Sequence, residues 1–159
     1  MKRAFTIDLN VWRFAATLKN ERGGDDYSSK QLLVSILKLC NTLFVPRGYV
    51  NIYIKIISGL GDSNEFIDQD IFRLWRDLWA TEGKLGWIED EPSVLEEEGM
   101  FDNDDIDFVR LAAHIDNGIV IVTTDDRLRN RLNELGMTSK YGFEILRPEG
   151  AIEYVGDKN

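Results

Sequence analysis

Three aspartates stand where apolar segments of this chain begin or end: Asp8, Asp107 and Asp125. Asp8 ends the run RAFTIDL at 3–9, Asp107 begins DFVRLAAHIDNG at 107–118, and Asp125 follows IVIVTT at 119–124. Carboxylates brought together repel one another, and a hard divalent cation such as Mg²⁺ or Mn²⁺ removes that conflict. Such a cation activates water and steadies the leaving oxygen in phosphodiester hydrolysis. The three residues therefore indicate metal-dependent hydrolysis, provided that the fold brings them together.

The expected elements do bring them together. A helix that begins at Asp107 and continues for about ten residues covers roughly 15 Å. The strand at 119–124 then returns over about six residues, roughly 20 Å, so Asp125 arrives where Asp107 began. Asp8 ends a parallel strand and reaches the same sheet edge, and open parallel sheets form their sites outside this edge. Asp107 at a helix N-terminus would also be favoured by the helix dipole.

The order of apolar patterns predicts the fold class. Short apolar or β-branched runs alternate with segments whose apolar residues recur at helical spacing, which is typical of a parallel α/β sheet. Strands are expected at 3–9, 42–46, 84–90, 119–124 and 143–148, and helices at 10–20, 29–41, 49–61, 64–83, 107–118 and 126–136. Asn10 is the expected cap of the first helix, and 91–104 is expected to be loop. The whole chain, 1–159, should form one three-layer α/β/α domain with a mostly parallel central sheet.

Charge is distributed unevenly along the 159 residues. The net charge is −9, but residues 1–61 carry +5, residues 62–107 carry −13 and residues 108–159 carry −1. The acidic middle keeps the protein soluble or contributes to a cation site, whereas the basic first third suits an anionic partner.

No apolar run is long enough to cross a membrane, and the N-terminus lacks the apolar region of a signal peptide, so we expect a cytoplasmic protein with no membrane partner.

The motifs resemble those of PIN-domain proteins, a family of metal-dependent ribonucleases that includes many toxins of toxin–antitoxin pairs. The family opens with a strand that ends in Asp, commonly followed by one residue and Asn, as in IDLN at 7–10. An Asp that starts a helix with alanines about one turn on follows later, as in DFVRLAA at 107–113, and then an apolar strand closes in Thr or Ser, one residue and Asp, as in GIVIVTTD at 118–125. FEILRPEGAIEYV at 143–155 resembles the family's closing strand and short helix.

The resemblance implies that Asp8, Asp107 and Asp125 hold Mg²⁺ or Mn²⁺ and catalyse cleavage, supported by Asn10 and by a hydrogen bond from Thr123 to one of these carboxylates. The alternative for Thr123 is plain strand propensity. One feature differs from the family, which usually carries a further acid near the start of the helix after the second strand. The corresponding stretch PRGYVNIYIKI at 46–56 has no acid, and Asn51 there offers an oxygen without a charge. Asp104 or Asp105 would then supply the missing carboxylate.

Basic side chains near these acids predict an RNA path. Arg127 and Arg131 follow Asp125 and, being four residues apart, share a helix face. Together with Arg13 from the basic first third, they are candidates for contacting the phosphates of a substrate strand. The alternative for this arginine pair is a solvated, salt-bridged face.

Two other functional classes remain open. A phosphatase-like hydrolase with an aspartyl nucleophile usually needs a second Asp two residues after the first, where this chain has Asn10. A catalytically weak or inactive PIN-like module that binds RNA or a protein partner would fit the missing acid.

We expect cleavage of single-stranded RNA, with an antitoxin protein and a second copy of the chain as further candidate partners.

Overall fold

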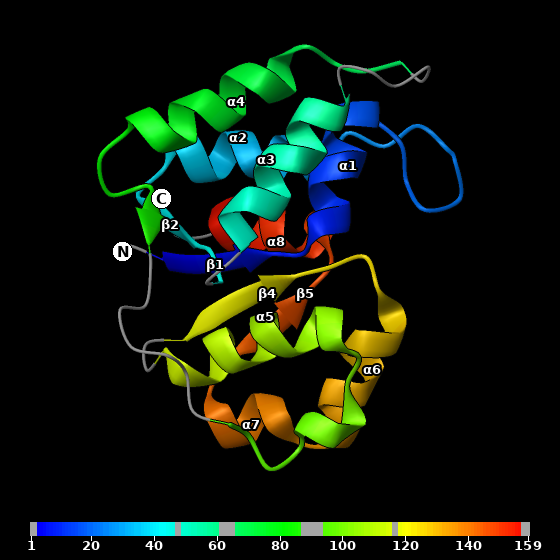
Figure 1. Cartoon of the computed structure of the whole chain (residues 1–159), viewed down its shortest axis with the longest axis vertical. Helices are drawn as coiled ribbons and strands as arrows, with labels where there is room; N and C mark the ends of the chain where they lie inside the picture. The colour runs from blue at the N-terminus through cyan, green and yellow to red at the C-terminus, as the bar shows by residue number, and fades with distance from the viewer. Residues whose placement is uncertain (1–2, 47–48, 61–65, 87–93, 116–117, 157–159) are drawn as a thin grey trace.

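The computed structural model describes residues 3–46, 49–60, 66–86, 94–115 and 118–156. Within these residues, five strands form one all-parallel sheet in the order β3-β2-β1-β4-β5. The strands are β1 (Arg3–Ile7), β2 (Asn41–Phe44), β3 (Leu85–Gly86), β4 (Ile119–Val122) and β5 (Glu144–Leu146). The predicted α/β class and parallel sheet are confirmed, and Figure 1 shows helices on both faces.

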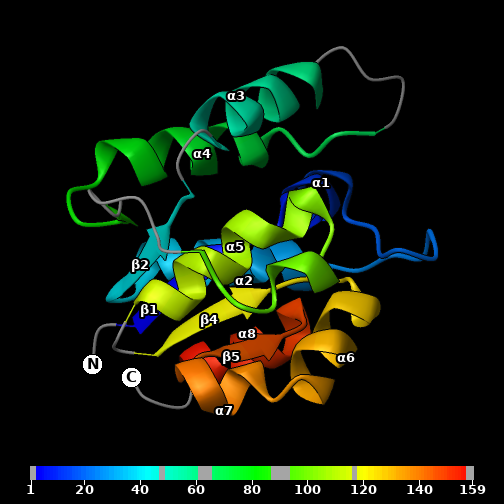
Figure 2. The ribbon, with the colours of Figure 1, turned by 60° about the horizontal axis from the view of Figure 1, so that its bottom comes forward.

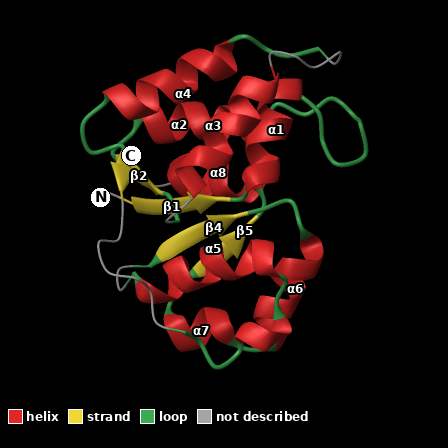
Figure 3. Ribbon diagram, viewed as in Figure 1, coloured by secondary structure: helices red, strands yellow, loops and turns green. Residues whose placement is uncertain are grey.

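Each face of the sheet has its own apolar core. Helices α1 (Leu9–Thr17), α2 (Ser28–Lys38), α4 (Asp70–Ala80) and α8 (Pro148–Gly156) contribute to one core with β1 and β2. Helices α5 (Asn103–His114), α6 (Asp126–Glu134) and α7 (Met137–Tyr141) pack mainly on the other face. Figure 3 shows the sheet between these two helical layers, and Figure 2 shows α3 (Tyr49–Leu60) beside α4. The β4 residues Ile119–Val122 are all buried, as expected for a strand covered on both faces.

Two predicted helix starts near the candidate site were wrong. The first helix begins at Leu9, with Asp8 rather than Asn10 in the cap position, and the Asn10 side chain is exposed. The fifth helix begins at Asn103, not at Asp107, because Asp102 has extended backbone and its carbonyl already accepts from the Asp105 and Ile106 N–H groups. Asp107 therefore lies one turn inside α5, beyond the residues that the helix dipole favours most.

Boundaries farther from the candidate site also differ from the prediction. The predicted helix 64–83 is shorter, at Asp70–Ala80, and residues 66–69 precede it without helical structure. The predicted loop at 91–104 contains a 3-10 turn at Glu98–Met100 and the start of α5, while 87–93 lie outside the described residues. The short helix α7 was not predicted. No helix in the described ranges is long and apolar enough to cross a membrane.

Candidate functional site

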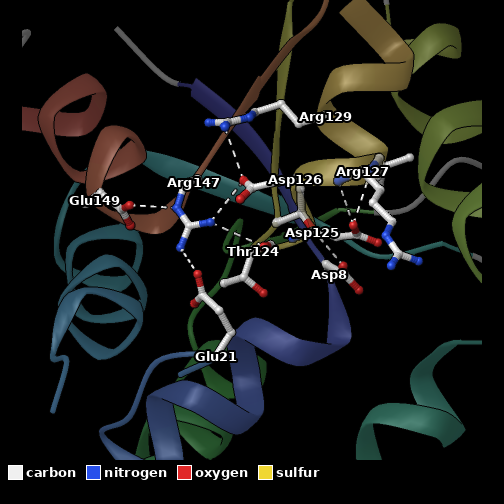
Figure 4. Close-up of polar contacts among 11 residues, drawn as sticks. Asp8, Glu21, Thr124, Asp125, Asp126, Arg127, Arg129, Arg147 and Glu149 are labelled. Atoms are coloured by element: carbon white, nitrogen blue, oxygen red, sulfur yellow. Dashed lines mark hydrogen bonds and ion pairs between the residues drawn. The ribbon is translucent and has the colours of Figure 1, made fainter. Parts of the chain in front are cut away.

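The order of the strands identifies one edge of the sheet as the candidate site. From β1 the chain builds outward through β2 to β3, and it then returns to the other side of β1 with β4 and β5. The order therefore reverses between β1 and β4, and open α/β sheets bind ligands outside the carboxyl ends of the strands at such a switch point. Asp8 directly follows β1, and Asp125 lies three residues after β4 (Figure 4).

Thr123 connects the two aspartates. Its buried hydroxyl Oγ1 donates a hydrogen bond to Asp8 Oδ2 at 2.8 Å and accepts one from the Asp125 backbone N–H at 3.0 Å. The Asp8 N–H also donates to the Val122 carbonyl at 2.9 Å, which extends the β1–β4 ladder by one residue. The hydrogen bond expected between Thr123 and a site carboxylate is thus confirmed. Thr123 sets the orientation of one carboxylate and the backbone position of the other.

Asp125 is also the N-cap of α6. Its Oδ1 accepts hydrogen bonds from the backbone N–H groups of Arg127 at 3.0 Å and Leu128 at 3.3 Å. A carboxylate in this position satisfies two of the free N–H groups at the start of the helix. Both bonds use Oδ1, and no described residue is hydrogen-bonded to the second oxygen, Oδ2, so it can bind a ligand.

The charge of Asp8 is poorly compensated by the protein. Burial raises the pKa of Asp8 above its ordinary value, and the negative charge of Asp125 raises it further, although hydrogen bonds from Thr123 and from backbone groups of Leu9 and Asn10 act in the opposite direction. Within the described part of the chain, neither aspartate forms an ion pair with a lysine or arginine. Two adjacent acids without a cation suit an added positive charge.

This electrostatic cost predicts that Asp8→Asn stabilises the metal-free protein at neutral pH. A raised folded-state pKa means that the folded protein binds the proton more tightly than the unfolded chain does, so wild-type stability falls as the pH rises through the Asp8 titration. Asparagine has no charge to bury, so the variant avoids this loss of stability, and its side-chain oxygen still accepts the Thr123 hydrogen bond. Thermal unfolding in EDTA should give a Tm a few degrees above wild type at pH 7.

The same measurement at lower pH is the control. The difference in Tm should shrink as the pH falls toward the ordinary aspartate pKa of about 3.9, where wild-type Asp8 is protonated. A variant that is less stable than wild type at pH 7 and shows no pH trend would mean that the Asp8 charge is already satisfied in the fold.

The remaining predicted acids are placed differently from this pair. Asp105, with Asp102 and Asp125, lines a hollow of about 210 Å³ between α5 and α6, whereas Asp107 is half-buried in α5 and does not line it. The side chain of Asp104 lies outside the described residues. Across the described ranges, no three His, Cys, Asp or Glu side chains form a group that could hold a metal ion. Asp8 and Asp125 are the two predicted acids that share the Thr123 hydroxyl as a hydrogen-bond partner.

The predicted basic residues lie on two sides of Asp125. Arg127 and Arg131 line the 210 Å³ hollow, and Arg131 also donates to the Met100 carbonyl. Arg13 and Asn10 line a larger cavity of about 730 Å³, to which Asp125 also contributes. Asn51 is exposed on α3. Asp125 thus stands at the junction of two hollows, each with arginine in its wall.

Sequence reasoning missed several residues that shape these hollows. Phe14, Phe66 and Thr124 line the larger cavity, and Asp102 lines the smaller one. No local sequence pattern singles out Phe66, because it fits the helical spacing of 64–83.

No protein-family model matches this chain, and comparisons with curated proteins and with solved structures found no match.

Proposed function

We propose that this chain is a PIN-like ribonuclease that uses Mg²⁺ or Mn²⁺ to hydrolyse phosphodiester bonds of single-stranded RNA. The observation that supports this most is the position of Asp8, Thr123 and Asp125 at the switch point of the sheet, with the hydroxyl of Thr123 bonded to both aspartates. The motifs around these residues are those on which the resemblance to PIN domains rests.

The donor set fits a hard divalent cation. Mg²⁺ commonly binds through one or two carboxylates, keeps several waters and takes further oxygens from phosphate. Asp8 and Asp125 would hold it, since they offer oxygen ligands with two negative charges and no ion-paired cation within the described residues. When bound, the ion would polarise a phosphoryl oxygen and lower the pKa of a bound water.

The other side chains have positioning roles in this proposal. Thr123 holds the Asp8 carboxylate in one orientation, and the cap of α6 fixes Asp125. The exposed Arg127 and the neighbouring Arg131 would contact phosphates on one side of Asp125, and Arg13 lies in the wall of the larger cavity on the other side. Asp105 would add a carboxylate on the side of the smaller hollow.

One observation favours a second candidate, a PIN-like module that binds RNA or a protein without cleaving. Two joined carboxylates, in place of a group of three or more among the described residues, would hold a metal more weakly. Metal binding is therefore the property that separates the two candidates.

Thermal unfolding with and without Mn²⁺ tests the proposal. A ligand that binds only the folded state adds RT ln(1 + [L]/Kd), or about 2.7 kcal/mol at one hundred times Kd, so millimolar Mn²⁺ should raise the wild-type Tm by several degrees. Asp125→Asn keeps a capping oxygen for α6 but loses a charge, and it should respond much less. Asp77→Asn, on the exposed face of α4, is the matched control and should respond like wild type. A wild type indifferent to Mn²⁺ would favour the binding module.

A further inference from the structure

The cavity of about 730 Å³ beside Asp125 is unlike a phosphate site. Its charged lining residues are two cations, Arg13 and Lys19, and two anions, Glu21 and Asp125. Lys19 is already paired with Asp25, with Nζ and Oδ1 at 2.5 Å. A phosphate entering this cavity would meet as many carboxylates as cations. A neutral group would avoid that repulsion.

The uncharged lining residues suit a flat aromatic ligand. Phe14 and Phe66 contribute aromatic rings, while Asn10 and Thr124 offer an amide and a hydroxyl group. Phe66 is 70% exposed, so its ring is accessible to a ligand that enters the cavity. Small-molecule sites typically combine such apolar walls with a few polar groups in a volume of about 300–1,000 Å³.

The walls are fixed by contacts between distant segments. The Asp68 N–H donates to the Ala16 carbonyl at 2.8 Å, which holds the segment that carries Phe66 against the end of α1. Asn20 Oδ1 accepts from the N–H groups of Arg22 and Gly24, both at 3.0 Å, and closes the loop after α1. These hydrogen bonds hold the Phe66 segment and the loop after α1 in place at the cavity wall.

Arg147, between β5 and α8, joins that loop to the candidate site. Its guanidinium donates to Glu21 Oε1 at 2.5 Å, to the Thr124 carbonyl at 3.3 Å and to Asp126 Oδ1 at 3.1 Å (Figure 4). Glu21 and Thr124 both line the cavity, so one side chain links its wall to the residue before Asp125. This arrangement keeps the cavity directly beside the site edge.

From these observations we propose that the cavity binds one nucleobase of the RNA strand, next to the bond that is cleaved, and that Phe66 and Phe14 supply the stacking faces. The proposal rests on the proposed function for the identity of the strand. The cavity is then a specificity subsite that a base enters, while the phosphates of the strand lie outside the cavity. Arg147 is a positioning residue for the subsite.

Fluorescence of a short single-stranded RNA that contains 2-aminopurine, measured in EDTA at low salt, tests this subsite without cleavage. Wild type should quench the fluorophore by stacking. Because stacking of a base on an aromatic side chain is worth about 1–3 kcal/mol, Phe66→Ala should raise Kd about 5- to 150-fold and abolish quenching. Phe66→Trp should retain both. Tyr27→Ala removes another aromatic ring, 56% exposed but outside the cavity lining, and should behave like wild type.

The outcomes separate this inference from the proposed function. Equal effects of Phe66→Ala and Tyr27→Ala, or wild-type binding without quenching, would overturn the subsite even if the protein cleaves RNA with Mn²⁺. A wild type that binds no RNA would overturn it as well. Quenching that depends on Phe66, in a protein that never cleaves, would support the subsite and reject the nuclease.

Discussion

Asp8→Asn is expected to slow metal-dependent cleavage of single-stranded RNA by about 10²–10³-fold, the usual effect of removing one electrostatic group from a catalytic site. The residue follows the central strand β1, and its neighbours Leu9 and Asn10 supply no second carboxylate. Asparagine can still accept the Thr123 hydrogen bond, so the orientation of the side chain is kept while its charge is lost. The measurement is the initial rate with a labelled RNA in Mn²⁺, with long incubation because turnover at a weak metal site is slow.

Two further variants define what that result means. Asp77→Asn removes a partly exposed acid of α4 and should leave the rate unchanged. Asp107→Asn tests the family motif directly, because Asp107 lies within α5 and not at its start. A purified Asp8→Asn protein that cleaves as fast as wild type would assign the activity to a contaminant or to another site, and the nuclease proposal would fail.

Trp12→Ala is expected to lower the free energy of unfolding by about 3–5 kcal/mol, as for other large aromatic residues truncated in a core. Trp12 is fully buried in α1, and its ring meets Trp75 of α4 edge to face, with centroids 5.2 Å apart. It lies one helical turn after Asp8, so the same contact that stabilises the core also holds the start of α1 at the site edge. Urea denaturation of wild type and variant measures this loss of unfolding free energy.

Trp79→Ala provides the comparison on the same aromatic cluster. Trp79 also contacts Trp75, with centroids 5.8 Å apart, but it is 44% exposed. Its truncation should lower the free energy of unfolding by about 0.5–1.5 kcal/mol, the contribution of one aromatic pair. Similar losses for the two variants would mean that Trp12 does not anchor α1 in the way described.

The part of the site that could be predicted from sequence is the part built on strand ends. Asp8 and Thr123–Asp125 follow short apolar runs, and a parallel sheet gathers such positions at one edge whatever the order of its strands. The start of α5 could not be located in the same way. Residues 102–107 contain four aspartates, each of which suits a first helical turn, so spacing alone did not distinguish Asp102 from Asp107.

Other features depend on tertiary contacts that no local pattern records. Phe66 fits the helical spacing of 64–83, yet the hydrogen bond from Asp68 to Ala16 holds its segment outside α4. Gly136 has φ of 66°, a left-handed conformation that ends α6 and allows the separate helix α7. The link from Arg147 to Glu21 joins residues 126 positions apart in the chain. The cavity that these contacts shape was therefore invisible in the sequence.

The central claim is that Asp8 and Asp125 together hold a divalent metal at the switch point between β1 and β4. A crystal of the wild-type protein soaked in Mn²⁺, with diffraction recorded to locate the anomalous signal of manganese, tests it most directly. We expect a manganese peak within coordination distance of both carboxylates, and its loss in an Asp8→Asn crystal. A peak bound only by Asp102 and Asp105, or no peak at manganese concentrations that saturate the thermal shift, would contradict it.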